Sequence, residues 1–374
     1  MFQGSFYAND TGICCVKCHN FKHKLALFYM KFEAITIKDI AKALGLSTST
    51  VSRALRDSYE ISPETKERVI EYAKEKNYRP NPIALSLKEK RSSSIGVLVC
   101  EIANSFFSQA INGIESVAQE KGYNVIIAQS KEDYEKEISS IQYLASRSVD
   151  GILFSVSAET SDFSHIQQLY ARGMNMVSFD RVVDFPDIHK VSVDNYKAAY
   201  EATTHFIKNG FTNIACIANA AFLSITKERV EGYTAALRDH NIKLNSENIF
   251  YCLHGGLNYE EVEEIMSRAM HGKHKPDAIL ACSDKITTSV MRYCQLENIA
   301  IPNEVGLVGF SNLDLTDLLA PSLTVVRQPA YEMGRIAAEL LIKQIESKRP
   351  IKDFEDVVIA TELHQRASSE KRKA

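Results

Sequence analysis

The stretch TIKDIAKALGLSTSTVSRALR, residues 36–56, predicts two short helices joined by a tight turn. Its first half has apolar residues at spacings of three and four, which gives one buried face made of Ile37, Ile40, Ala41 and Leu44. Gly45 follows this face, and glycine commonly ends a helix. A second helix begins at once, because serine and threonine are available as N-caps and Val51, Ala54 and Leu55 share a face.

The sequence SPETKERVIEYAKEKNY, residues 62–78, predicts a third helix. Ser62 is a good N-cap, Pro63 suits the first helical position, and acidic residues follow in the first turns. We expect its apolar face to consist of Val69, Ile70, Tyr72 and Ala73. The next stretch, RPNPIALSLKEKRSSS, residues 79–94, breaks this helix with two prolines and predicts a short helical run followed by a basic linker.

Helices joined by a glycine-containing turn fit a helix-turn-helix. The second helix of such a unit enters the DNA major groove, where short polar side chains at its start reach base edges and an arginine can bond guanine O6 and N7 together. Any small three-helix bundle has the same spacing, so periodicity alone leaves a purely structural bundle open. The basic linker favours DNA binding.

From Ile95 onward, short apolar runs alternate with amphipathic stretches. The ten runs are IGVLVC, NVIIAQ, DGILFSV, NMVSFD, KVSVD, NIACIAN, NIFYCLH, DAILACS, VGLVGF and LTVVRQ. Continuous apolar runs separated by helix-length segments indicate parallel sheets covered on both faces. Ten strands are too many for one open sheet, so residues 95–366 are predicted to form an α/β body of two doubly wound halves. We expect a charged tail over residues 367–374.

The composition of the 374-residue chain is that of a folded protein, with 45% hydrophobic and 24% charged residues and a net charge of −3. Basic residues outnumber acidic ones 13 to 9 over residues 30–91, and acidic residues outnumber basic ones 37 to 28 over residues 92–374. A basic arm on an acidic body suggests nucleic-acid binding by the arm. No apolar run is long enough to span a membrane and no export signal is evident, so we expect a cytoplasmic location.

The eight cysteines do not predict a disulfide framework. Five of them lie singly in or near apolar runs and are expected to be reduced core thiols, namely Cys100, Cys216, Cys252, Cys282 and Cys294. The remaining three belong to the stretch around CVKCH, residues 15–19, which matches a c-type haem-attachment motif. Such attachment belongs to exported proteins, and the spacing of cysteine and histidine here is irregular for zinc. Met30 resembles a natural start, so we expect residues 1–29 to be a disordered extension without cofactor or metal.

Taken together, the quoted stretches resemble the lac/gal repressor family of transcription regulators. The likeness begins in the helix-turn-helix and continues through NSFFSQAINGIE, SVDGILF, VSFDR, KERVEGY, VGLVGFSN and LTVVRQPAYEMG, in this order. It covers about residues 33–366. The resemblance implies a helix-turn-helix DNA-binding unit over residues 30–80, a hinge helix and linker over residues 81–94, and a two-lobed effector-binding and dimerisation body over residues 95–366 that is similar to periplasmic sugar-binding proteins.

The resemblance assigns DNA contacts to particular residues. Thr48 and Ser49 begin the recognition helix and would read bases, with Arg53 one turn later. Ser47 would be both N-cap and phosphate contact, and Thr36 also matches a phosphate-contacting position. In the hinge helix, the leucine that the family wedges into the minor groove matches Leu87, beside Lys88. An ordinary helix-face leucine is the alternative interpretation of Leu87.

The resemblance also implies a ligand between the two lobes. Asn104, Phe106 and Phe107 follow the first predicted strand, where they would bond hydroxyls and face the apolar side of a sugar ring, although adjacent phenylalanines also suit core packing. Asp180 and Arg181 follow another strand, and Arg229 lies on the opposite lobe. Two positions depart from the family pattern, because Ser283 replaces a common asparagine and Ser311 replaces a common aspartate; both would line the site, and both weaken the case for a ribose-like binding mode.

We therefore predict a repressor that binds operator DNA as a homodimer and whose operator affinity is controlled by a small metabolite, such as a sugar or sugar derivative. The rival is an exported solute-binding protein, which would need an export signal and no DNA-binding arm. No nucleotide-binding loop, nucleophile elbow or zinc-protease motif is present, so we do not expect an enzyme.

Overall fold

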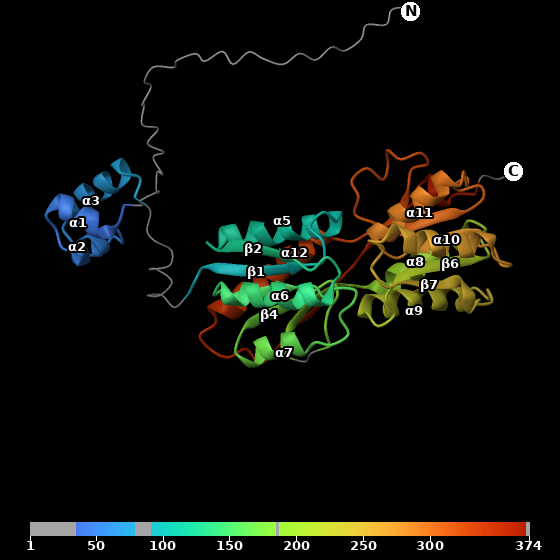
Figure 1. Cartoon of the computed structure of the whole chain (residues 1–374), viewed down its shortest axis with the longest axis horizontal. Helices are drawn as coiled ribbons and strands as arrows, with labels where there is room; N and C mark the ends of the chain where they lie inside the picture. The colour runs from blue at the N-terminus through green and yellow to red at the C-terminus, as the bar shows by residue number, and fades with distance from the viewer. Residues whose placement is uncertain (1–34, 79–90, 185–186, 372–374) are drawn as a thin grey trace, which may run out of the picture. The chain divides into compact units, whose positions relative to one another are not determined.

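The computed structural model describes residues 35–78, 91–184 and 187–371. The chain divides into two compact units, Met1–Asn81 and Pro82–Ala374, and Figure 1 shows the elements of each. The predicted extension over residues 1–29 and the predicted short helical run of the linker lie outside the described residues.

The small unit contains the three predicted helices, which are α1 (Ile37–Leu44), α2 (Thr48–Ala54) and α3 (Pro63–Glu75). Gly45 ends α1 with φ of 66°, in the left-handed region that glycine adopts without strain. The buried core consists of Ile40, Ala41, Val51, Ala54, Val69 and Ala73. The prediction for Ile70 was wrong: this side chain is 37% exposed, because one helical step turns it away from the face of Val69.

The first lobe of the large unit is built on a six-stranded parallel sheet in the order β11-β5-β4-β3-β1-β2. Its strands are β1 (Ser94–Val99), β2 (Asn124–Gln129), β3 (Gly151–Phe154), β4 (Asn175–Phe179), β5 (His189–Val193) and β11 (Asp356–Ile359). Helices α5 (Ser105–Glu120) and α12 (Ala330–Glu346) pack on one face, and α6 (Tyr134–Ser146) and α7 (Ser164–Ala171) pack on the other. Burial on both faces explains why the inner strands are continuous apolar runs.

The second lobe repeats this arrangement with the strand order β12-β10-β9-β8-β6-β7, in which only β12 is antiparallel to its neighbour. Its strands are β6 (Ile214–Asn219), β7 (Ile249–Cys252), β8 (Ala278–Ala281), β9 (Gly306–Phe310), β10 (Thr324–Arg327) and β12 (Glu362–His364). Helices α8 (Asn195–Lys208) and α9 (Ser224–Asp239) cover one face, and α10 (Tyr259–His271) and α11 (Asp284–Leu296) cover the other. Short 3-10 turns lie at Ser246–Asn248 and Ala367–Ser369.

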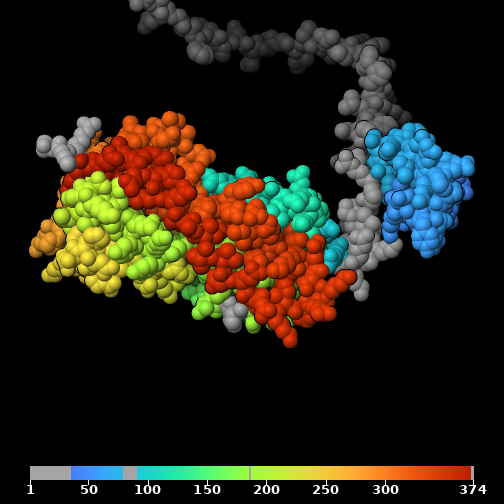
Figure 2. All heavy atoms as spheres, turned by 180° about the vertical axis from the view of Figure 1, so that it is seen from behind, coloured from blue at the N-terminus to red at the C-terminus, as the bar shows by residue number. Residues whose placement is uncertain are grey.

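The chain crosses between the lobes after β5, after β10 and after β11. Seen from behind, residues of the last third of the chain run across both lobes on one face of this unit (Figure 2). The carboxyl ends of strands from both sheets therefore meet where the chain crosses, which is where open α/β sheets hold their ligands.

All ten predicted strands are present, but two of the four edge strands, β11 and β12, were not predicted. Both are short and only partly buried, so their sequence shows no continuous apolar run. The expected charged tail also begins too early, because Ser368 and Ser369 are buried in the second lobe. The Ser368 hydroxyl donates to the Leu307 carbonyl at 2.6 Å, which ties this segment to β9. The five cysteines predicted as core thiols are free and buried.

Candidate functional site

Helix α2 presents the residues expected to read DNA. Ser47 caps this helix, and its Oγ accepts a hydrogen bond from the Thr50 amide at 3.0 Å. Thr48 and Ser49, in the first turn, are exposed. Arg53 is also exposed and forms an ion pair with Glu60, with 2.8 Å between Nη1 and Oε2. All three side chains expected to reach bases are thus accessible, although Arg53 is engaged by a carboxylate.

Thr36 is the N-cap of α1 and is part of a capping box with Asp39. The Asp39 carboxylate accepts from the Thr36 amide at 2.9 Å and from the Thr36 hydroxyl at 2.7 Å. These hydrogen bonds lower the pKa of Asp39 below its usual value. The side chain of Thr36 therefore has a local structural role, and its contact to a DNA phosphate stays a prediction. Leu87 and Lys88 lie outside the described residues, so their predicted roles stay predictions.

The structure brings the predicted polar residues of the large unit to the boundary between the lobes. Asp180 and Arg181 directly follow β4 of the first lobe, and Arg229 lies on α9 of the second lobe. All three are at most 6% exposed. Together with Asp284 at the start of α11, they form what we term the interlobe site.

Asp180 is the carboxylate of the first lobe at the interlobe site. Burial raises its pKa above the usual value, and the positive charges of Arg181 and Arg229 offset this only in part. Its φ of 59° lies in the left-handed region, which is unfavourable for a residue with a Cβ. An unfavourable backbone conformation held at a buried charge is common at functional positions.

Arg229 is held in one position by neighbours from several segments. Its Nε donates to Asn195 Oδ1 at 2.9 Å and its Nη1 donates to the Cys282 carbonyl at 2.6 Å. Nη2 lies 3.4 Å from Gln328 Oε1, and the guanidinium carbon lies 4.1 Å from the centre of the Phe310 ring. Burial lowers the pKa of Arg229. The side chain thus contacts Gln328, where the chain crosses between the lobes after β10. Its positive charge lowers the pKa of Asp180 in the other lobe.

Arg181 does not point freely into the interlobe site. Its Nη1 and Nη2 donate to the two carboxylate oxygens of Glu132 at 2.5 and 2.8 Å. Nη1 also lies 3.2 Å from the Val156 carbonyl and 3.4 Å from Cys100 Sγ. Glu132 was not identified from the sequence, because it follows β2 in a polar loop that carries no motif of its own.

Asn104, Phe106 and Phe107 lie at the start of α5. Asn104 caps the helix by accepting from the Phe106 amide at 2.9 Å. Both phenylalanines are buried, at 6% and 3% exposed, and belong to the core of the first lobe. The Phe107 ring packs edge-on against Phe179 with their centres 6.4 Å apart. The side chain of Phe107 therefore serves core packing. The backbone amide of Phe106 lowers the pKa of Asp284, which belongs to the second lobe.

Ser283 and Ser311 lie beside Asp284: Ser283 precedes it in the chain, and Ser311 bonds its carboxylate. Ser283 is the N-cap of α11 and accepts from the Ile286 amide at 3.2 Å. The Ser311 hydroxyl donates to Asp284 Oδ1 at 2.5 Å, and the Asn312 amide donates to the same oxygen at 3.0 Å. Burial raises the pKa of Asp284, while the Ser311 hydroxyl and the amides of Asn312 and Phe106 lower it. The anionic residue at this wall was missed in the sequence, although it directly follows Ser283.

Several buried polar atoms near the interlobe site have no hydrogen-bond partner among the described residues. They are Arg181 Nε, Asn219 Oδ1, Thr226 Oγ1 and Gln328 Nε2. Asn219 ends β6, Thr226 lies in the first turn of α9, and Gln328 directly follows β10. Buried polar groups are nearly always bonded, so such a group of unpaired donors and acceptors is a feature of ligand sites.

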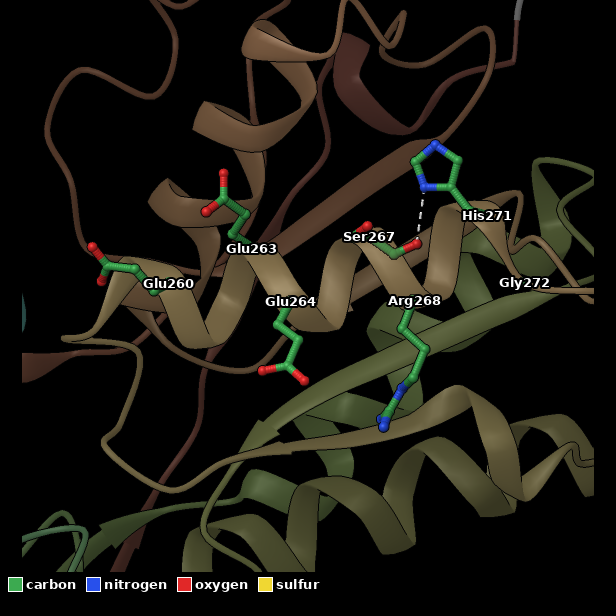
Figure 3. Close-up of a pocket in the computed structure, with 7 residues that line it drawn as sticks. All are labelled: Glu260, Glu263, Glu264, Ser267, Arg268, His271 and Gly272. Carbon is green, nitrogen blue, oxygen red and sulfur yellow. Dashed lines mark hydrogen bonds between the residues drawn. The ribbon is translucent and has the colours of Figure 1, made fainter.

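Other surface features are weaker candidates. A groove of about 620 Å³ follows the outside of α10, where three glutamates and Arg268 project in different directions instead of converging (Figure 3). Within the described residues, no group of three or more potential ligands could hold a metal ion. No helix in the described part of the chain is long and apolar enough to cross a membrane.

Comparison with known proteins divides the chain at the same place as the structure. Residues 36–81 match the family described as bacterial regulatory proteins, lacI family, and residues 92–367 match periplasmic binding proteins and the sugar-binding domain of the LacI family. The HTH-type transcriptional repressor PurR of Vibrio vulnificus (strain CMCP6) is 31% identical over 313 residues, which cover 84% of this chain and 92% of that protein.

Solved structures show the same relationship. The complex of the transcriptional regulator CelR with cellobiose has a TM-score of 0.65 at 27% identity, covering 89% of this chain and 99% of that one. The lac repressor dimer bound to operator and the anti-inducer ONPF has a TM-score of 0.75 at 20% identity, covering 90% and 99%, which shows the shared fold.

Proposed function

The chain belongs to the lacI family of bacterial regulatory proteins, and we propose that it is a transcriptional repressor whose operator affinity is set by a small metabolite bound between the lobes. The observation that carries this proposal is the presence of two sites in one chain. Exposed Thr48, Ser49 and Arg53 lie along one short helix, and unpaired buried polar atoms gather where two α/β lobes meet. The first suits base edges and the second suits a small polar molecule.

For DNA, α2 acts as the recognition helix. Its length of seven residues fits the major groove, and Thr48 and Ser49 at its start contact bases while Ser47 contacts a phosphate. Arg53 exchanges its exposed partner Glu60 for guanine, because an exposed ion pair is weak and a bidentate guanine contact is stronger. A homodimer presents two such helices to a nearly palindromic operator. We place the protein in the cytoplasm, where operator DNA is found.

For the effector, Asp180, Arg229 and Asn104 supply acceptors and donors from both lobes. A ligand that bonds residues of both lobes favours their closed arrangement over an open one. The unpaired atoms of Asn219 and Gln328 gain partners in this arrangement, which makes binding favourable. The relatives are repressors and no catalytic constellation is evident in the described residues, so we propose binding without catalysis.

Helix α12 provides a route from the effector to the linker. It begins just after Gln328, which contacts Arg229 and Asn312, and the Ile345 carbonyl in its last turn accepts from Arg91 Nη2 at 2.8 Å. Ser92 and Ser93, which follow Arg91, are held by Asp150, whose carboxylate accepts from their amides at 2.7 and 2.8 Å. A change at Gln328 is thereby passed to the residues that lead to the DNA-binding unit. By linkage, operator DNA changes effector affinity by the same factor.

Two experiments test this function. Selection of binding sites from random DNA with the full chain should yield a two-fold symmetric sequence. A thermal-shift screen against sugars, sugar phosphates and purines should then find a compound that stabilises the native protein. Failure to select any sequence would contradict sequence-specific operator binding by this chain.

A further inference from the structure

Arg181 is neutralised by a carboxylate that the fold holds in place. Glu132 binds its guanidinium through two parallel hydrogen bonds, and the two side chains are only 9% and 7% exposed. Glu132 Oε2 also accepts from the Ala158 amide at 2.7 Å. Such a bidentate, buried pair is among the strongest polar contacts in proteins. The charge of Arg181 is thus compensated, and among its nitrogens only Nε is left as an unpaired donor.

The backbone conformation at Glu132 indicates that the fold holds this carboxylate next to Arg181. Lys131 and Glu132 have φ of 53° and 62°, so two consecutive residues with a Cβ adopt the left-handed region. Each such residue costs free energy that surrounding contacts must offset. Glu132 also reaches the second lobe: a Cβ placed at Gly255 would lie only 3.0 Å from its Oε1. The carboxylate is therefore located at the boundary where the ligand is expected.

The other charges of the interlobe site leave no excess positive charge. Its two guanidinium groups, on Arg181 and Arg229, lie with two carboxylates of the site, on Asp180 and Asp284, and with the carboxylate of Glu132 that pairs with Arg181. The ion pair between Lys285 and Glu101, 3.0 Å apart, adds no net charge. Behind Arg229, Glu228 adds a further carboxylate, which accepts from Asn195 at 2.9 Å.

The atoms left for a ligand are mostly uncharged. Among the described residues, the hydroxyls of Ser130 and Thr226, the Asn219 carbonyl oxygen and the Gln328 amide nitrogen are buried and unpaired, and Arg181 Nε is the one unpaired atom of a charged group beside them. Hydroxyl groups can donate and accept, so a polyhydroxyl compound can satisfy all of these atoms. A phosphate ester carries about −1.5 to −2 charges at pH 7. Burying this negative charge is unfavourable when the site offers no free cation to pair with it.

We propose that Glu132 determines the class of effector by neutralising Arg181, so that the interlobe site binds uncharged, hydroxyl-rich compounds and rejects their phosphate esters. This inference rests on the proposed function, because it assumes that the effector occupies the interlobe site. It assigns a specificity role to a residue that forms no part of the DNA-binding helix.

The wild-type protein provides the first test. Three matched pairs are titrated by calorimetry: ribose with ribose 5-phosphate, glucose with glucose 6-phosphate, and adenosine with adenosine monophosphate. In any pair that binds, the neutral compound should bind at least about tenfold more tightly than its ester. An ester that binds as tightly as its neutral parent would overturn the proposal.

A second test does not depend on finding the effector. The Tm is measured in sodium sulfate and in sodium chloride of equal ionic strength, for the wild type, Glu132→Gln and Glu137→Gln. Glu137 is the control, because it is also a buried carboxylate of the same lobe, but its partners are His165, at 2.9 Å, the Ser157 amide and the Thr160 hydroxyl, so its neutralisation frees no arginine. Only Glu132→Gln should show an additional rise in Tm with sulfate, and Arg181→Gln in the same chain should remove it.

The two tests separate the possible failures. If none of the six compounds binds, the proposed effector function is weakened, while the sulfate comparison still decides whether Glu132 blocks anion binding. If the wild type shows a sulfate-specific rise that Arg181→Gln abolishes, Arg181 is a free anion site and the proposal is wrong, whether or not Glu132→Gln folds. The same conclusion follows if wild type and Glu132→Gln respond equally to sulfate.

Discussion

Asn312 and Gln109 exchange two hydrogen bonds although they belong to opposite lobes. Asn312 Nδ2 donates to Gln109 Oε1 at 2.8 Å, and Gln109 Nε2 donates to the Asn312 carbonyl at 3.1 Å. The Asn312 side chain also bonds the backbone of Gln328 in both directions, at 2.8 and 3.1 Å. One amide side chain therefore connects α5, the loop after β9 and the crossing that leads into α12.

Asn312→Ala should destabilise the protein by about 1–3 kcal/mol, because it leaves buried backbone groups of Gln328 without partners. Gln109→Ala should cost less, since Gln109 is only partly buried. Urea unfolding of both single variants and the double variant measures the coupling energy between the two side chains. Strict additivity would show that the hydrogen bond between the Asn312 and Gln109 side chains contributes nothing; the bond from Gln109 to the Asn312 carbonyl is present in Asn312→Ala and lies outside this cycle.

Asp180→Asn should raise the stability of the effector-free protein while weakening effector binding. The raised pKa of Asp180 means that its ionisation opposes folding: the wild type loses stability as pH rises from the unfolded value through the raised folded value. The neutral variant lacks this loss, and asparagine tolerates the positive φ well. The gain in Tm over wild type should therefore be larger at pH 7 than at pH 4. A gain that is equal or smaller at pH 7 would contradict the assignment of a penalised carboxylate.

Arg53→Ala should cost about 1–3 kcal/mol of discrimination at one base position in each half-site. Glu60→Ala, which releases Arg53 from its ion pair, should strengthen operator binding by less than about 1 kcal/mol, because both partners are exposed. Binding-site selection with each variant measures these effects. Unchanged base preference at every position in Arg53→Ala would mean that Arg53 does not read bases.

Asp150→Asn should weaken the transmission of effector binding more than it weakens binding itself. The neutral amide holds the Ser92 and Ser93 amides less firmly than the carboxylate does, so the start of the linker is less well fixed to the lobe. The ratio of operator Kd values with and without effector should move towards one, while effector affinity by calorimetry stays within about threefold. If Asp150→Asn kept the wild-type ratio of operator Kd values, Asp150 would not take part in the transmission.

The sequence predicted those parts of the molecule whose determinants are local. Caps at Ser47 and Ser62, the turn at Gly45 and the ten apolar runs that form strands all depend on residues close together in the chain, so their pattern is visible in the sequence. The edge strands β11 and β12 lack such a pattern because solvent covers part of each.

The interlobe site was predicted only in part, because its partners are distant in sequence. Asn312 bonds a residue 203 positions away, and Arg181 bonds one 49 positions away. The family resemblance identified Asp180, Arg181 and Arg229 as candidates, but it could not reveal that Glu132 forms an ion pair with Arg181. That pairing follows from the loop after β2, whose left-handed residues have no distinctive sequence signal.

The most direct test of the account combines the two sites in one measurement. The operator obtained by selection is titrated with the full chain, with and without the compound that gives the largest thermal shift, for the wild type and Arg229→Lys. Lysine keeps the charge but loses the planar fork that contacts Asn195, Cys282 and Gln328. Arg268→Lys, on the exposed side of α10, is the matched control.

We expect the compound to change the operator Kd of wild type and control by about tenfold or more, and that of Arg229→Lys by less than about threefold. The operator Kd values measured without the compound should be nearly equal in all three proteins. An equal response of Arg229→Lys and wild type would contradict a metabolite-controlled repressor that senses its effector at this site.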